Sequence, residues 1–213
     1  MAKVFRLVAL LIAVVFAGPI FAGPALAADA ADAADAEALK KAEAYLNSVT
    51  TLKSRFVQVN PDGGNYNGDL YISRPGRMRL VYDAPTPMLM VADGKFLIYV
   101  DTQMNDASHL DLNDTPAGLI LKENLSFSDP SVKLIEVKRG PGTLEITAAM
   151  AKDPGMGKLT LVFSDAPFEL RQWRVVDAQN KEVVVTLENA QKGVSLDRSL
   201  FRYDARAARA KEN

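Results

Sequence analysis

The sequence predicts a mainly β protein with a few helices, built on an antiparallel sheet that curls toward a barrel. Strand-like runs follow one another along most of the chain, and short turn motifs separate them at hairpin spacing. In residues 158–163, apolar side chains alternate with polar ones, so one face of that strand is buried and the other meets water. Two segments have the pattern of a helix instead.

Residues 1–27 have the composition of a secretory signal peptide. Lys3 and Arg6 precede an apolar run, and Ala25-Leu26-Ala27 provides small residues at the cleavage positions. An uncleaved membrane anchor would need about 20 unbroken apolar residues, whereas Gly-Pro pairs interrupt this run. We expect cleavage after Ala27, which leaves 186 of the 213 residues.

The remaining chain is predicted to form one domain. Residues 28–36 are a low-complexity stretch of Ala and Asp, which predicts a flexible leader. An amphipathic helix follows from residue 37, because apolar residues recur at spacings of three and four up to Val49. We expect the domain to span residues 37–204 and a charged tail to occupy residues 205–213.

Residues 68–94 carry the most informative pattern, a predicted β-meander. Two strands meet at a turn at Pro75-Gly76, and a proline-containing turn, an apolar strand and a hairpin turn at Asp93-Gly94 follow. The second strand alternates charged with apolar side chains, which places three residues on one face: Met78, Leu80 and Tyr82. These apolar faces predict a concave binding surface for an apolar ligand.

The other predicted elements complete the sheet. Strands are expected at residues 52–59, 96–100, 132–138, 143–149, 158–163, 168–176, 181–188 and around 200–203. A short apolar helix is expected within residues 113–125, where Thr115 is a candidate cap and Pro116 suits the first helical position.

Composition and motifs argue against several functions. The net charge of −1 gives no reason to expect nucleic acid as a partner, and without cysteine the chain has neither disulfides nor a lipidation site. It has no H-E-x-x-H, P-loop or G-x-S-x-G motif, and its one histidine, His109, cannot build a zinc site alone. The acidic residues of the region 101–114 lack the tight glycine turn of a calcium loop. We therefore expect no enzyme activity, no metal and no cofactor.

The meander resembles that of the LolA family, the periplasmic carriers of outer-membrane lipoproteins. The matching positions are Gly68, Leu70, Ile72, Arg74-Pro75, Met78-Arg79-Leu80, Tyr82, Pro85 and Asp93-Gly94-Lys95. Residues 115–123 also resemble the family's T-P-x-x-L-L segment. Met78 and Leu80 depart from the pattern, since the family usually has an aromatic residue at the first position and Trp at the second.

The resemblance implies a half-open antiparallel β-barrel with a helical lid. It implies that Leu119 and Ile120 belong to the lid, and that Arg74 closes the lid over the empty cavity by donating hydrogen bonds to lid carbonyls. Without the resemblance, the favoured interpretation of Arg74 is a surface arginine at a turn.

Methionine suits a pocket that must accept acyl chains on variable paths, because its side chain is unbranched and adaptable. The alternative for each Met is ordinary core filling. The acyl-binding residues expected on this basis are Met78, Leu80, Tyr82, Met88, Met90, Leu119, Ile120 and Trp173.

The function implied by the resemblance is a monomeric periplasmic carrier that needs no covalent chemistry. Its implied partners are acylated lipoproteins as cargo, an inner-membrane ABC-type release complex, and an outer-membrane receptor or the outer membrane itself. An alternative on the same fold is a carrier or sensor of another envelope lipid, which the departures at Met78 and Leu80 keep open. We also expect no Pro-rich C-terminal extension like that of many family members, since Phe201-Arg202-Tyr203 leads directly into the charged tail.

Overall fold

The computed structural model describes residues 25–104 and 106–203. Most of the expected signal peptide and the whole charged tail lie outside the described residues. Within them the strands are β1 (Thr51–Val59), β2 (Asn65–Ser73), β3 (Arg77–Tyr82), β4 (Met88–Asp93), β5 (Phe96–Asp101), β6 (Asp106–Asp111), β7 (Val132–Gly140), β8 (Thr143–Met150), β9 (Gly157–Asp165), β10 (Phe168–Asp177) and β11 (Glu182–Lys192). The helices are α1 (Ala25–Ser48) and α2 (Pro116–Ile120), with short 3-10 turns η1 (Leu112–Asp114), η2 (Pro154–Met156) and η3 (Arg198–Phe201).

All eleven strands belong to one open antiparallel sheet, which confirms the predicted fold class. The strand order is β6-β5-β4-β3-β2-β1-β11-β10-β9-β8-β7, so two meanders meet where β1 pairs with β11. The expected hairpin turns are present at Gly76 and Gly94, which adopt φ values of +75° and +107° that favour glycine. The outermost strands, β6 and β7, are joined in sequence by residues 112–131, which we call the crossing segment.

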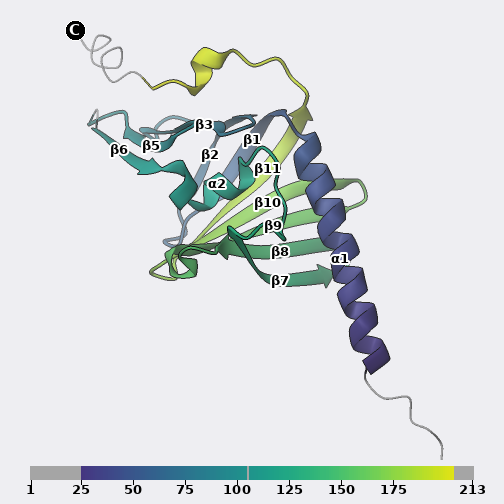
Figure 1. Cartoon of the computed structure of the whole chain (residues 1–213). Coiled ribbons are helices and arrows are strands. Elements are labelled where there is room, and N and C mark those ends of the chain that lie inside the picture. Colours follow the sequence, from purple (N-terminus) through teal and green to yellow (C-terminus); the bar gives the residue numbers. More distant parts are fainter. Residues whose placement is uncertain (1–24, 105, 204–213) are drawn as a thin grey trace, which may run out of the picture.

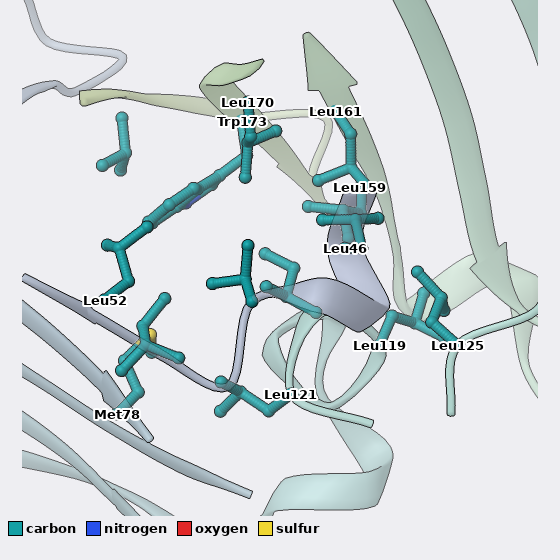
Figure 2. Packing of buried hydrophobic residues seen from close by; sticks show 14 of the residues in the cluster. Leu46, Leu52, Met78, Leu119, Leu121, Leu125, Leu159, Leu161, Leu170 and Trp173 are labelled. Carbon is teal, nitrogen blue, oxygen red and sulfur yellow. The ribbon is translucent and has the colours of Figure 1, made fainter. Parts of the chain in front are cut away.

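Helix α1 and the crossing segment cover the same face of the sheet, which we call the inner face (Figure 1). Alternate residues of each strand point to this face, as in β1, where Leu52, Ser54, Phe56 and Gln58 are buried. Figure 2 shows side chains from α1, α2 and the sheet packed together, among them Leu46, Leu119 and Leu159. The main core therefore lies between the sheet and its helical cover.

Helix α1 begins earlier than the sequence indicated. Residues 28–36, expected as a flexible leader, are helical and continuous with the rest of α1, which projects past β7 (Figure 1). Six of these nine residues are alanine, which has the highest helix propensity of any residue. Asp35 also pairs with Arg139 of β7 at 2.6 Å between carboxylate and guanidinium. The expectation of a leader separate from the helix was therefore wrong.

The predicted last strand around residues 200–203 is also wrong, because η3 occupies this position. Asp197 caps η3 by accepting a hydrogen bond from the backbone N–H of Ser199 at 2.7 Å. The turn lies against β3 and β4 on the outer face of the sheet, where the Arg79 guanidinium donates to the carbonyl of Leu200 at 3.0 Å. Phe201 is buried there, so the C-terminal segment covers part of the outer face.

Candidate functional site

A cavity of about 260 Å³ lies between the inner face of the sheet and α2. Most of its wall is apolar, with polar groups from a few side chains. The lining residues are Gln58, Asn60, Met78, Leu80, Tyr82, Met88, Met90, Leu97, Tyr99, Thr115, Pro116, Ala117, Ile120, Trp173, Val175, Val183 and Val185. Seven of the eight residues predicted as acyl-binding are among them: Met78, Leu80, Tyr82, Met88, Met90, Ile120 and Trp173.

Strand register brings these side chains together. In the ladder from β3 to β5, Leu80 lies opposite Met90, which lies opposite Tyr99. Across-strand neighbours point to the same face, so these residues form one row along the cavity wall. Trp173 reaches the cavity from β10, in the other half of the sheet. The cavity is therefore bounded by both meanders.

The cavity has a buried end and an exposed end. Met78 and Leu97 are almost fully buried and lie on the row that also contains Ala92. Met88 and Tyr99 are 37% and 38% exposed. We call the exposed end, formed by Asn60, Met88 and Tyr99, the mouth.

Helix α2 forms the cover of the cavity, and its two predicted lid residues point in different directions. Ile120 lines the cavity. Leu119 packs away from it among Leu125, Phe127 and residues of β8 and β9, so it does not line the cavity. Because α2 is a helix, neighbouring residues face about 100° apart, and only one of this pair can face the sheet's cavity. The sequence pattern predicted both Leu119 and Ile120 as acyl-binding and did not distinguish their directions.

Thr115 stands at the start of α2, but its hydroxyl does not cap the helix. The hydroxyl instead donates to the carbonyl of Leu112 at 2.8 Å. Pro116 occupies the first turn of the helix, where a missing N–H costs nothing.

Arg74 joins the sheet to its helical cover. Its Nε donates to the carbonyl of Lys122, just after α2, at 2.9 Å, and Nη2 donates to the same oxygen. Its Nη1 donates to the carbonyl of Leu46, and Nη2 lies 3.3 Å from the side-chain oxygen of Asn47, both in α1. Partial burial lowers the pKa of the guanidinium. One side chain therefore fastens both helical elements that cover the inner face.

Two further side chains fasten α1 to the crossing segment. Asn47 donates to the carbonyl of Leu125 and accepts from its N–H, each at 2.9 Å. Glu43 accepts hydrogen bonds from the N–H of Phe127 at 2.6 Å and from the hydroxyl of Ser126 at 3.0 Å. The cover of the cavity is thus held by a small set of directional polar contacts as well as by packing.

Sequence reasoning missed a row of polar side chains in the wall. The hydroxyl of Tyr82 donates to Oε1 of Gln58 at 2.7 Å, and Nε2 of Gln58 donates to Oδ1 of Asn60 at 2.7 Å. Burial raises the pKa of the Tyr82 phenol, which stays neutral at physiological pH. Gln58 follows Phe56 at a spacing of two, so the strand pattern places it on the inward face of β1. A polar residue at an inward position was the signal in the sequence that could have predicted this polar row.

The residues considered for other chemistry do not form a site in the described part of the chain. His109 is exposed on the edge strand β6 and packs edge-on against Phe96, with 6.0 Å between ring centroids. No three His, Cys, Asp or Glu residues among those described are grouped so that they could hold a metal ion. In the same residues, no helix is both long and apolar enough to cross a membrane.

One protein family matches most of this chain. The family described as "Outer membrane lipoprotein carrier protein LolA" matches residues 47–204. This chain belongs to the LolA family. The match covers every strand of the sheet, the crossing segment and η3.

Individual relatives agree with this assignment. An outer-membrane lipoprotein carrier protein from Ralstonia nicotianae is 29% identical over 184 residues, which cover 80% of this chain and 84% of the relative. One from Chromobacterium violaceum is 33% identical over 141 residues, covering 63% of this chain and 67% of the relative. A third, from Pseudomonas aeruginosa, is 26% identical over 190 residues, covering 84% and 89%.

Solved structures are similar at low sequence identity. A DUF1329 family protein from Desulfovibrio piger has a TM-score of 0.51 at 9% identity, covering 78% of this chain and 95% of that one. A LolA superfamily protein from Nitrosomonas europaea has a TM-score of 0.43 at 11% identity, covering 78% and 96%. At 9% identity, the similarity to the Desulfovibrio piger protein shows a shared fold and nothing about function.

Proposed function

We propose that this protein carries acylated lipoproteins through the periplasm. It receives them from an ABC-type release complex of the inner membrane, holds their acyl chains in the cavity beneath α2, and delivers them to an outer-membrane receptor or to the outer membrane directly. It acts as a monomer and without catalysis. Membership of a lipoprotein carrier family supports the class of cargo.

The observation that carries the proposal is the apolar cavity under a helical cover. Exposing acyl chains to water costs about 0.8 kcal/mol per methylene, so a carrier must enclose them. The wall offers three methionines, Met78, Met88 and Met90, whose flexible side chains can follow chains on different paths. Apolar contact is not directional, so cargo can leave when a partner offers a more favourable surface.

The cavity is too small for a whole anchor in this closed state. Its volume of about 260 Å³ lies below the range of about 300–1,000 Å³ that is usual for sites of single drug-sized ligands. Several acyl chains therefore need α2 or α1 to move away from the sheet. The polar contacts of Arg74, Asn47 and Glu43 hold both elements in place, and they are the contacts that opening must break.

The test is recovery of the natural cargo. The protein is purified from the periplasm without detergent, and bound material is identified by mass spectrometry. We expect triacylated lipoproteins, and we expect the empty protein to take up lipoproteins released from spheroplasts. Recovery of phospholipid or glycolipid alone would support the alternative of another envelope lipid. A protein that stays empty and accepts no lipoprotein would contradict the proposal.

A further inference from the structure

Three polar side chains of the cavity wall are joined by hydrogen bonds at one end of it. Gln58 and Asn60 follow one another on the inner face of β1 and its turn, and the phenol of Tyr82 joins them from β3. The opposite end, around Met78 and Leu97, is apolar and buried. The cavity therefore changes from polar at the mouth to apolar inside.

Gln58 is an unusual residue for the wall of such a cavity. The residue is almost fully buried, with 7% of its surface exposed. A buried amide costs about 1–3 kcal/mol unless it is hydrogen-bonded, and an apolar residue would fill the same position without that cost. Its oxygen accepts from Tyr82 and one of its two N–H groups donates to Asn60, which leaves one N–H without a protein acceptor among the described residues.

Asn60 adds more donors at the same end. Its side-chain oxygen accepts from Gln58, and its own amide nitrogen donates to no group within residues 25–104 and 106–203. Asn60 is only half-buried and lies at the start of the β1–β2 turn. Gln58 and Asn60 thus offer N–H donors beside an apolar interior, and the side-chain oxygen of each already accepts one hydrogen bond.

We infer that Gln58 and Asn60 form a subsite for the ester carbonyl that joins an acyl chain to its polar anchor. The inference rests on the proposed function and specifies which chemical group of the cargo is hydrogen-bonded at this end of the cavity. Ester carbonyls accept hydrogen bonds, whereas ether oxygens and methylenes at the same position do so weakly or not at all. The acyl chain then runs toward Met78, and the polar end of the cargo leaves the protein beside Asn60.

The test compares two lipids that differ only in this carbonyl. Palmitoyl-lysophosphatidylcholine carries an ester-linked chain, and hexadecyl-lysophosphatidylcholine carries an ether-linked chain of the same length. Each competes below its critical micelle concentration for a fluorescent acyl probe on the full-length mature protein. One hydrogen bond of about 0.5–1.5 kcal/mol predicts that the wild type binds the ester about 2- to 12-fold more tightly.

The variants are chosen so that loss of folding cannot imitate the result. Gln58→Met is made together with Tyr82→Phe, because replacing both partners leaves no buried hydroxyl without an acceptor. Tyr82→Phe alone is the reference, so the two proteins differ only at Gln58. Gln191→Met, on an exposed position of β11, is the control for the same substitution elsewhere in the sheet. Circular dichroism and urea unfolding verify that each variant is folded.

The expected result is that the ester preference falls in the double variant relative to Tyr82→Phe, with Asn60 as the remaining donor, and is retained in Gln191→Met. Equal binding of both lipids by the wild type, or the same preference in Tyr82→Phe and in the double variant, would overturn the subsite while leaving the acyl carrier in place. Failure of the wild type to bind either lipid would overturn the subsite and the proposed carrier function together.

Discussion

The side chain of Arg74 donates through Nε to the backbone carbonyl of Lys122 at 2.9 Å, and the two residues are 48 positions apart in the chain. The same guanidinium donates to the carbonyl of Leu46 in α1. A planar group with five donors can serve two carbonyls on separate elements at once. These bonds hold α1 and the segment after α2 against the sheet, so they favour this arrangement over any in which α2 has moved.

Arg74→Leu is expected to make opening easier. Loss of these bonds lowers the cost of separating the cover from the sheet by about 1–3 kcal/mol, which raises the apparent affinity for acyl chains and slows their release. Binding of a fluorescent acyl probe and transfer of lipoprotein to outer-membrane vesicles measure the two effects.

The matched control is Arg79→Leu. Arg79 is also partly buried and donates to a backbone carbonyl, that of Leu200, but it does so on the outer face. We expect this variant to loosen η3 without changing acyl binding. If Arg74→Leu matched the wild type in both loading and release, Arg74 would not be a lid latch.

A charge at the mouth is expected to block cargo. In Met88→Glu a carboxylate would stand at the cavity wall, and desolvating it as acyl chains enter costs several kcal/mol. We predict at least a tenfold loss of acyl-probe affinity, equivalent to about 1.4 kcal/mol.

Val81→Glu provides the comparison for that experiment. Val81 has the same exposed fraction as Met88, 37%, and lies in the neighbouring strand, but it points to the outer face. Its substitution is predicted to leave probe binding unchanged. Equal losses in both variants would mean that the cavity is not where acyl chains bind.

Asn47→Ala is expected to destabilise the cover. The substitution removes both hydrogen bonds to Leu125, together with the longer one from Arg74, and leaves the N–H and the carbonyl of Leu125 without these partners, which predicts a loss of about 1–3 kcal/mol in the free energy of unfolding. Urea unfolding measures the loss. Ser48→Ala is the control one residue further on, because the Ser48 hydroxyl is exposed and bonds only within α1. A stability loss no larger than that of Ser48→Ala would contradict the prediction.

Alkaline stability is expected to depend on Tyr82. Burial raises the pKa of its phenol above the ordinary value of 10.0, so above about pH 10 the unfolded chain releases a proton that the folded chain retains. The contribution of Tyr82 to the free energy of unfolding is then constant below about pH 10 and falls as the pH rises beyond it.

Removing the phenol tests this dependence. Tyr82→Phe is predicted to reduce the fall by up to about 1.4 kcal/mol per pH unit, measured by urea unfolding between pH 8 and pH 11. Part of the fall should remain, because burial also raises the pKa of Tyr45 and Tyr99. An identical pH dependence in wild type and variant would show that Tyr82 ionises freely in the folded protein.

Much of the fold follows from local patterns in the sequence. Alternation of side chains and glycine turns predicted nearly every strand, and the same alternation placed Met78, Leu80 and Tyr82 on one face. Gly68 of the matched motif has a physical reason that the pattern alone did not reveal. A Cβ at this position would come within 2.7 Å of the ring of Phe56 and closer still to the carbonyl of Val81.

The remaining features depend on contacts between distant residues. Whether Leu119 or Ile120 faces the cavity is set by how α2 docks on the sheet, and a five-residue helix is too short for periodicity to decide this. Strand propensity around Leu200 was overridden by the Asp197 cap and by Arg79 of β3. Gln58 was overlooked because a single polar residue does not interrupt an apolar pattern, although in three dimensions it has Tyr82 and Asn60 as partners.

The pairing of β1 with β11 at the middle of the sheet has a consequence for the order of folding. Leu52 lies opposite Lys192, so the two halves of the sheet cannot join until nearly the whole chain is available. Closing so long a loop is entropically costly and makes folding slow, on the scale of milliseconds to seconds for β-rich domains. A chain that crosses a membrane N-terminus first would therefore be unable to complete its sheet until Lys192 has also crossed.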